Sequence, residues 1–115
     1  MADKSQFEKL SLEFNEQQNT LNDLISTRSQ LETQYQENKI VLNEFDSLND
    51  ESKIYKLTGP ILVPQEFAEA KLNVTKRIEF IEDEIKRAET KISEEEKKIE
   101  GTREKLLAIR ASMGA

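Results

Sequence analysis

The segment KIYKLTGPILVP, residues 53–64, decides how this chain of 115 residues is organised. It contains the first glycine and both prolines of the sequence, and only two glycines follow it. Glycine and proline are the residues that most strongly interrupt regular secondary structure. The sequence therefore predicts a long uninterrupted segment, a short break and a second long segment.

Both long segments repeat apolar residues at alternating spacings of three and four, which is typical of paired helices. In the first segment these seam positions are Phe7, Leu10, Phe14, Gln17, Leu21, Leu24, Arg28, Leu31, Tyr35, Asn38, Leu42 and Phe45. In the second they are Lys71, Val74, Ile78, Ile81, Ile85, Ala88, Ile92, Glu95, Ile99, Thr102, Leu106, Ile109 and Met113. We therefore predict amphipathic helices over about 3–48 and about 66–112.

The short break requires the two helices to run antiparallel, so the predicted fold class is mainly α, a long antiparallel two-helix coiled coil. No internal repeat or low-complexity linker occurs, and we predict a single domain over residues 1–115. A register that places the charged interruptions of the two seams together pairs Arg28 with Glu95 and Phe14 with Ile109. A slip of half a heptad stays open.

Two short runs rich in apolar and β-branched residues flank Gly59-Pro60, and this pattern predicts a β-hairpin over about 53–64. A hairpin of two strands is barely stable alone in water. We therefore predict that it joins hairpins of other subunits in a shared β-barrel. The alternative is a private small core against the helices. The expected assembly residues are Ile54, Tyr55, Leu57, Ile61, Leu62 and Val63.

Apolar residues away from the seams indicate further contacts. Near the hairpin we expect a set of them to pack under the sheet or against a neighbouring subunit: Ile40, Val41, Leu48, Leu72 and Phe80. Where the two chain ends meet, we expect apolar residues to hold an apolar ligand, although most of them also suit ordinary seam packing. These tip residues are Phe7, Leu10, Leu12, Phe14, Leu106, Leu107, Ile109 and Met113.

Composition argues against several other classes. The sequence has no histidine and no cysteine, and no phosphate-binding loop, so we predict no enzyme, no metal and no cofactor. The formal net charge of −6 argues against nucleic acid as a partner. The longest apolar run, Ile61 to Val63, predicts no membrane span, and the polar start of the chain predicts no secretory signal.

Three stretches resemble the beta class of prefoldin subunits: QLETQYQENKIVLNEF at 30–45, YKLTGPILV at 55–63 and NVTKRIEFIE at 73–82. The resemblance covers most of the chain and is strongest from about residue 30 to residue 87. One central hairpin fits the beta class rather than the alpha class. The two ends of the chain match mainly in their heptad character.

The resemblance implies an ATP-independent holdase subunit in a cytoplasmic hetero-hexamer of alpha- and beta-class prefoldin subunits. In such an assembly the hairpins form a double β-barrel and the coiled-coil tips hold unfolded or nascent proteins such as actin and tubulin. The assembly then delivers these clients to the cytosolic chaperonin. The alternative function is a passive structural coiled coil that tethers or spaces its partners.

Overall fold

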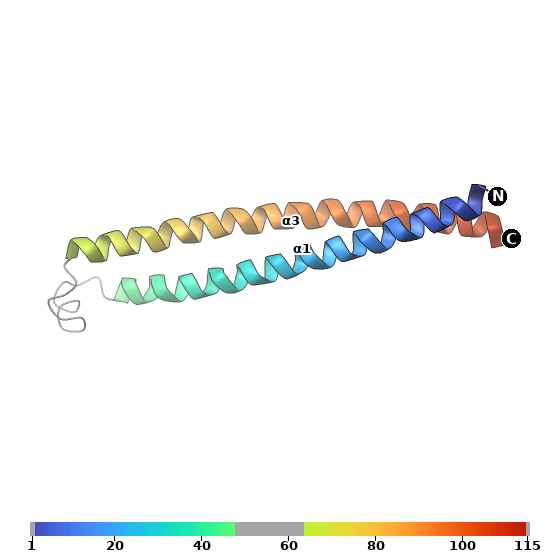
Figure 1. Ribbon diagram of the computed structural model, residues 1–115. Helices are drawn as coiled ribbons and strands as arrows, with labels where there is room; N and C mark the ends of the chain where they lie inside the picture. Colours follow the sequence, from blue (N-terminus) through green and yellow to red (C-terminus); the bar gives the residue numbers. More distant parts are fainter. Residues whose placement is uncertain (1, 48–63, 115) are drawn as a thin grey trace. The chain divides into compact units, whose positions relative to one another are not determined.

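The computed structural model describes residues 2–47 and 64–114, which form two long helices (Figure 1). Helix α1 spans Ala2–Ser47 and helix α3 spans Pro64–Gly114. Both predicted helices are therefore confirmed, with ends displaced by one or two residues. The predicted hairpin lies outside the described residues except for Pro64, which is the first residue of α3 instead of the last residue of a strand.

The local sequence explains where each helix stops and starts. In the last turn of α1, the Ser47 hydroxyl donates a hydrogen bond of 2.7 Å to the Glu44 carbonyl oxygen, which the helix itself leaves without a partner. Pro64 suits the first position of α3, because its missing N–H is not needed there. The carboxylate of Glu66 lies in the first turn, where it interacts favourably with the helix dipole.

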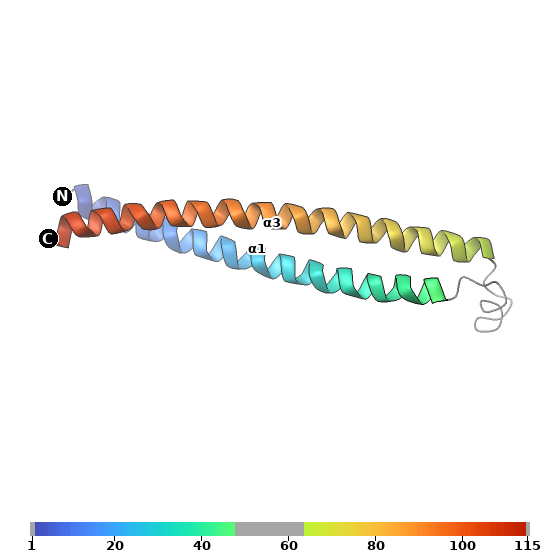
Figure 2. The ribbon, with the colours of Figure 1, turned by 180° about the vertical axis from the view of Figure 1, so that it is seen from behind.

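The contacts within the chain group into two compact units. The terminal unit consists of residues 1–28 and 87–115, and the middle unit consists of residues 29–86. In the terminal unit the first turns of α1 lie beside the last turns of α3, so the two segments run antiparallel (Figures 1 and 2). Over the described residues, neither helix has a stretch apolar enough to cross a membrane.

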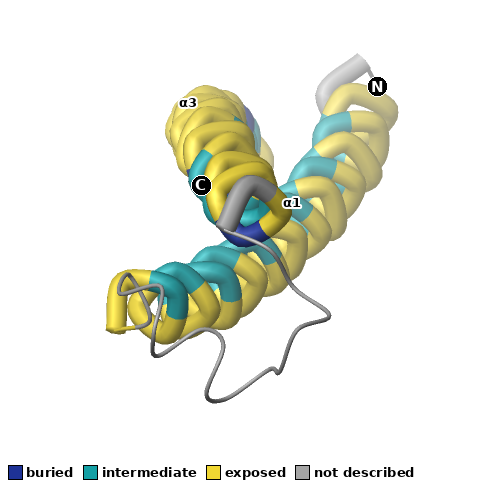
Figure 3. Tube along the Cα trace, turned by 90° about the vertical axis from the view of Figure 1, so that its left-hand side faces the viewer, coloured by how far each residue is buried: buried dark blue, intermediate teal, exposed yellow. Residues whose placement is uncertain are grey.

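The predicted seams form the inner faces of the helices. Every seam position of α1 is half-buried, and Figure 3 shows these positions recurring along one side of the helix. Every seam position of α3 is buried or half-buried except Met113. Among the described residues, the buried side chains all belong to α3: Phe67, Ile78, Ile81, Ile85, Ala88, Ile99 and Thr102. The heptad pattern therefore identifies the packed faces correctly.

The middle unit combines an aromatic contact with an ion pair. The rings of Phe45 and Phe67 meet edge to face with centroids 5.1 Å apart. Next to them, the ammonium of Lys71 lies 2.8 Å from the Asp46 carboxylate. Of the residues expected to pack under a sheet or a neighbour, Leu48 lies outside the described part of the chain, and four are exposed: Ile40, Val41, Leu72 and Phe80. Their proposed packing stays a prediction.

The predicted register is wrong. In the terminal unit the Arg28 guanidinium donates two hydrogen bonds to one Glu89 carboxylate oxygen, at 2.8 and 3.3 Å. Glu89 precedes the predicted partner, Glu95, by six residues, or about 9 Å along the helix. The physical reason is that a repeat of seven aligns apolar seams equally well after a shift of about one heptad. The apolar pattern alone does not distinguish the two alignments.

A double-mutant cycle distinguishes the two registers. We expect Arg28→Ala and Glu89→Ala to be coupled by about 0.5 kcal/mol in the free energy of unfolding, because the pair is half-exposed. The matched cycle with Glu95→Ala should show a coupling energy near zero. Urea unfolding followed by circular dichroism measures both cycles. Coupling to Glu95 in place of Glu89 would restore the register predicted from the sequence.

Two seam positions of the terminal unit carry polar atoms without a partner. The Gln17 side-chain oxygen and one Glu95 carboxylate oxygen are buried and make no hydrogen bond among the described residues. The Gln17 amide nitrogen does donate to Glu13, at 3.3 Å. A buried polar atom that loses its water without gaining a partner lowers stability by about 1–3 kcal/mol.

Replacing the poorly satisfied carboxylate should therefore stabilise the helix pair. We expect Glu95→Leu to raise the free energy of unfolding by about 1–2 kcal/mol, because it removes the unsatisfied oxygen and adds an apolar seam contact. Glu96→Leu is the matched control, since Glu96 is exposed and should change stability by less than about 0.5 kcal/mol. Equal effects of the two variants in thermal unfolding would contradict this account.

Gly101 lies within α3 beside the buried Thr102, where a glycine weakens the helix. A Cβ atom added at Gly101 meets nothing within 4 Å. We therefore expect Gly101→Ala to raise the free energy of unfolding by about 1 kcal/mol. Gly114→Ala, which also meets open space but stands at the helix end, is the control with little expected effect. Destabilisation by Gly101→Ala in calorimetry would show that this position needs a glycine.

Candidate functional site

The terminal unit has two grooves near the chain ends, one on each side of the seam. The wide groove has a volume of about 780 Å³ and the narrow groove a volume of about 240 Å³. The wide groove is lined by Gln6, Lys9, Leu10, Leu12, Glu13, Glu16, Lys105, Ala108 and Ile109. The narrow groove is lined by Phe7, Ser11, Phe14, Arg103, Leu106, Leu107 and Arg110.

Helical spacing explains why the seam separates two grooves. On α1, Gln6, Leu10 and Glu13 follow one another at intervals of four and three, so they share one side of the helix. Phe7, Ser11 and Phe14 have the same spacing one residue later and share the neighbouring side. The same sequence repeat that builds the seam therefore supplies a groove on each flank.

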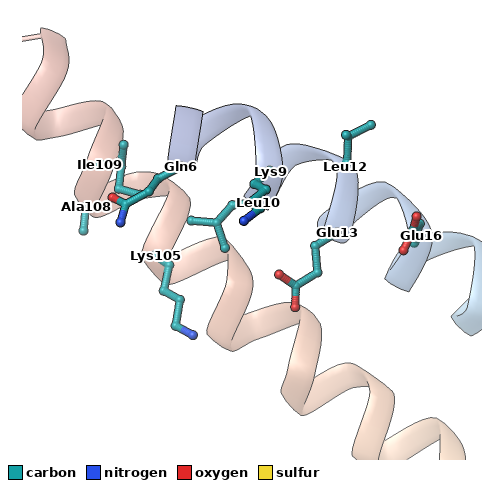
Figure 4. Close-up of a pocket in the computed structure, with 9 residues that line it drawn as sticks. All are labelled: Gln6, Lys9, Leu10, Leu12, Glu13, Glu16, Lys105, Ala108 and Ile109. Carbon is teal, nitrogen blue, oxygen red and sulfur yellow. The ribbon is translucent and has the colours of Figure 1, made fainter. Parts of the chain in front are cut away.

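The wide groove combines an apolar floor with balanced charge. Figure 4 shows Leu10 pointing from α1 toward α3, where Ile109 and Ala108 lie, whereas Leu12 points away from α3. The charged residues of the lining are Lys9 and Lys105 together with Glu13 and Glu16. With two cations and two anions around apolar side chains, this groove suits an apolar segment with no strong charge preference.

The narrow groove is more aromatic and carries only positive charge. Phe7 and Phe14 line it from α1, and Leu106 and Leu107 line it from α3. Arg103 and Arg110 are the charged residues of its lining. Phe7, Phe14 and Leu106 are half-buried, and Leu107 is 55% exposed. Each of these side chains therefore leaves apolar surface open to a ligand.

The structure brings seven of the eight predicted tip residues into the two grooves. Leu10, Leu12 and Ile109 line the wide groove, and Phe7, Phe14, Leu106 and Leu107 line the narrow groove. Met113 lines neither and is 48% exposed. The predicted assembly residues, Ile54, Tyr55, Leu57, Ile61, Leu62 and Val63, lie outside the described residues.

Sequence reasoning missed the polar walls of both grooves and one exposed apolar residue. Arg103, Arg110 and Ser11 line the narrow groove but were not predicted, because only apolar residues stand out from a highly charged sequence. The available signal was their spacing of three or four residues from the predicted apolar positions. Ile25, which is 49% exposed, was also missed, and it lines neither groove. Among the described residues, no group of three acidic side chains is placed to hold a metal ion.

Comparison with known families agrees with this arrangement of two helices. The family model described as "Prefoldin subunit" matches residues 8–110, which include most of the lining of both grooves. The chain belongs to the prefoldin subunit family. Membership implies a co-chaperone role and assembly with other prefoldin subunits.

The similar curated proteins bear the name of one subunit of that family. Prefoldin subunit 6 of Saccharomyces cerevisiae is 46% identical over 88% of this chain and 89% of its own length. Probable prefoldin subunit 6 of Caenorhabditis elegans is 36% identical over 97% of this chain and 89% of its own length. Prefoldin subunit 6 of Homo sapiens is 40% identical over 80% of this chain and 71% of its own length. No solved structure matches this one.

Proposed function

We propose that this chain is a subunit of a hexameric, ATP-independent holdase in the cytoplasm, and that its two terminal grooves bind unfolded or nascent proteins. One observation carries the proposal: eight apolar residues from the two ends of the chain, seven of them predicted tip residues, line two open grooves on one unit. Clients such as actin and tubulin, and their delivery to the cytosolic chaperonin, belong to the same proposal and rest on family membership.

Two leucines support client binding most directly. Leu12 is 66% exposed and Leu107 is 55% exposed, and neither occupies a seam position. Exposed apolar side chains that add nothing to helix pairing still have to be hydrated, and a cluster of them on one unit marks an interaction surface. A denatured client offers apolar segments without a fixed shape. Open grooves accept such segments better than an enclosed, rigid pocket does.

Weak contacts suffice if several subunits act together. A single groove covers only a few apolar side chains of a client, so one contact alone is released quickly. Linking several such contacts raises the overall affinity by orders of magnitude without strengthening any one of them. Assembly with other prefoldin subunits would place several such grooves on one complex. In this proposal the hairpin residues 53–64 join subunits, and neighbours cover the exposed Phe80 and Leu72 of the middle unit.

The alternative, a passive tether, predicts that the grooves are dispensable. A tether needs the paired helices and the assembly segment but no apolar groove at the chain ends. The test therefore has to change the grooves while leaving the seam intact. Leu12 and Leu107 meet this condition, since each lines a groove and lies off the seam.

We expect the double variant Leu12→Ser, Leu107→Ser to assemble normally and to bind a denatured client about tenfold more weakly, because it loses two apolar contacts. Light scattering of a chemically denatured client measures protection from aggregation, and native mass spectrometry measures assembly with partner subunits. Ile25→Ser is the control, since Ile25 is exposed on the same unit outside both grooves. Unchanged protection by the double variant would favour the tether.

A further inference from the structure

We propose that the narrow groove selects client segments in which acidic residues stand next to large apolar residues. This inference rests on the proposed function and specifies which segments one of the two grooves prefers. The wide groove has balanced charge, whereas the charged residues of the narrow groove are both arginines. Charge complementarity favours carboxylate-bearing polypeptide over a segment that is only apolar.

The two guanidinium groups lie at a spacing that an extended chain can match. Arg103 and Arg110 are seven residues apart on α3, so they share one side of the helix and lie about 10 Å apart along its axis. An extended peptide advances about 3.3 Å per residue and its side chains alternate between two faces, so two acidic residues four positions apart share a face and lie about 13 Å apart. The long arginine side chains can bridge the remaining few ångströms. The preferred segment therefore has the form acidic–x–x–x–acidic, with a large apolar side chain midway between the two acids on the same face.

Both arginines are available to a ligand. Arg103 lies 3.9 Å from the Glu100 carboxylate on the same helix, and both side chains are more than half exposed, so this contact is weak. Arg110 makes no ion pair with any described residue. In the same unit, by contrast, the Arg28 guanidinium lies 2.8 Å from the Glu89 carboxylate. Carboxylates of the chain itself would therefore compete only weakly with a client carboxylate for Arg103 and Arg110.

The apolar side chains of the narrow groove would contact the large apolar residues of the client segment. Phe7 and Phe14 from α1 and Leu106 from α3 are half-buried in the seam and present their remaining surface to the groove. Arginine can stack on an aromatic side chain and donate to a carboxylate at the same time. The chain as a whole carries a net charge of −6, which opposes acidic ligands. The two arginines provide a local contact that overcomes this opposition.

The test uses the full chain assembled with partner prefoldin subunits and four fluorescent peptides of equal length. Three share the same phenylalanine and leucine residues and carry aspartate, serine or lysine at two positions four apart. The fourth keeps the aspartates and replaces every apolar residue by serine. Fluorescence anisotropy measures each dissociation constant at low and at high salt.

We expect the acidic apolar peptide to bind about three- to tenfold more tightly than the lysine peptide, with a smaller difference in high salt. The double variant Arg103→Gln, Arg110→Gln should abolish this difference between the acidic and lysine peptides. Lys97→Gln with Lys98→Gln is the control, because both lysines are exposed outside the grooves. This control should keep the preference for the acidic peptide.

Three results would overturn the inference. The first is equal affinity for the acidic and lysine peptides, and the second is an acidic preference that survives loss of both arginines. The third is equally tight binding of the aspartate peptide that lacks apolar residues, which indicates a general surface for polyanions. The proposed function itself fails if the Leu12→Ser, Leu107→Ser variant has the same affinity for the serine peptide as the unchanged protein. If only the charge preference is missing, the holdase proposal stands.

Discussion

Two helices alone cannot cover each other's apolar faces, and this constraint governs the rest of the structure. No described residue of α1 is buried, although every one of its seam positions faces α3. In a larger bundle further helices would cover the flanks of the seam. Here the flanks stay open, and the two grooves of the terminal unit are the result. Open apolar surface is therefore a direct consequence of building a unit from only two helices.

The sequence predicts the helices well and their register poorly, for a definable reason. Each apolar seam residue indicates its own face of the helix, so a seam of a dozen positions determines that face reliably. The register depends on the few positions that break the pattern. Arg28 has a long side chain and reaches Glu89, which lies off the seam, rather than the seam residue Glu95. A shift of about one heptad keeps the apolar positions aligned, so spacing alone does not identify the partner of Arg28.

The candidate site divides in the same way into predictable and unpredictable parts. Its apolar residues stand out in the sequence because they lie on or beside the seam at the chain ends. Its polar residues do not, since a chain that is 35% charged offers many equivalent arginines and glutamates. Arg103 and Arg110 differ from other cations only in lying beside Phe7 and Phe14 of the other helix. That relation exists only once the helices are paired in a particular register.

The polar defects of the seam gather in the terminal unit, together with the grooves. Gln17 and Glu95 each bury an oxygen atom without a partner, and Gly101 adds a weak helix position beside the buried Thr102. Each of these features lowers the free energy required to separate the two helix ends. The segment that presents the grooves is therefore held together less firmly than an apolar seam would hold it. In the proposed holdase, this lower stability would reduce the energetic cost of widening the grooves for clients of different size.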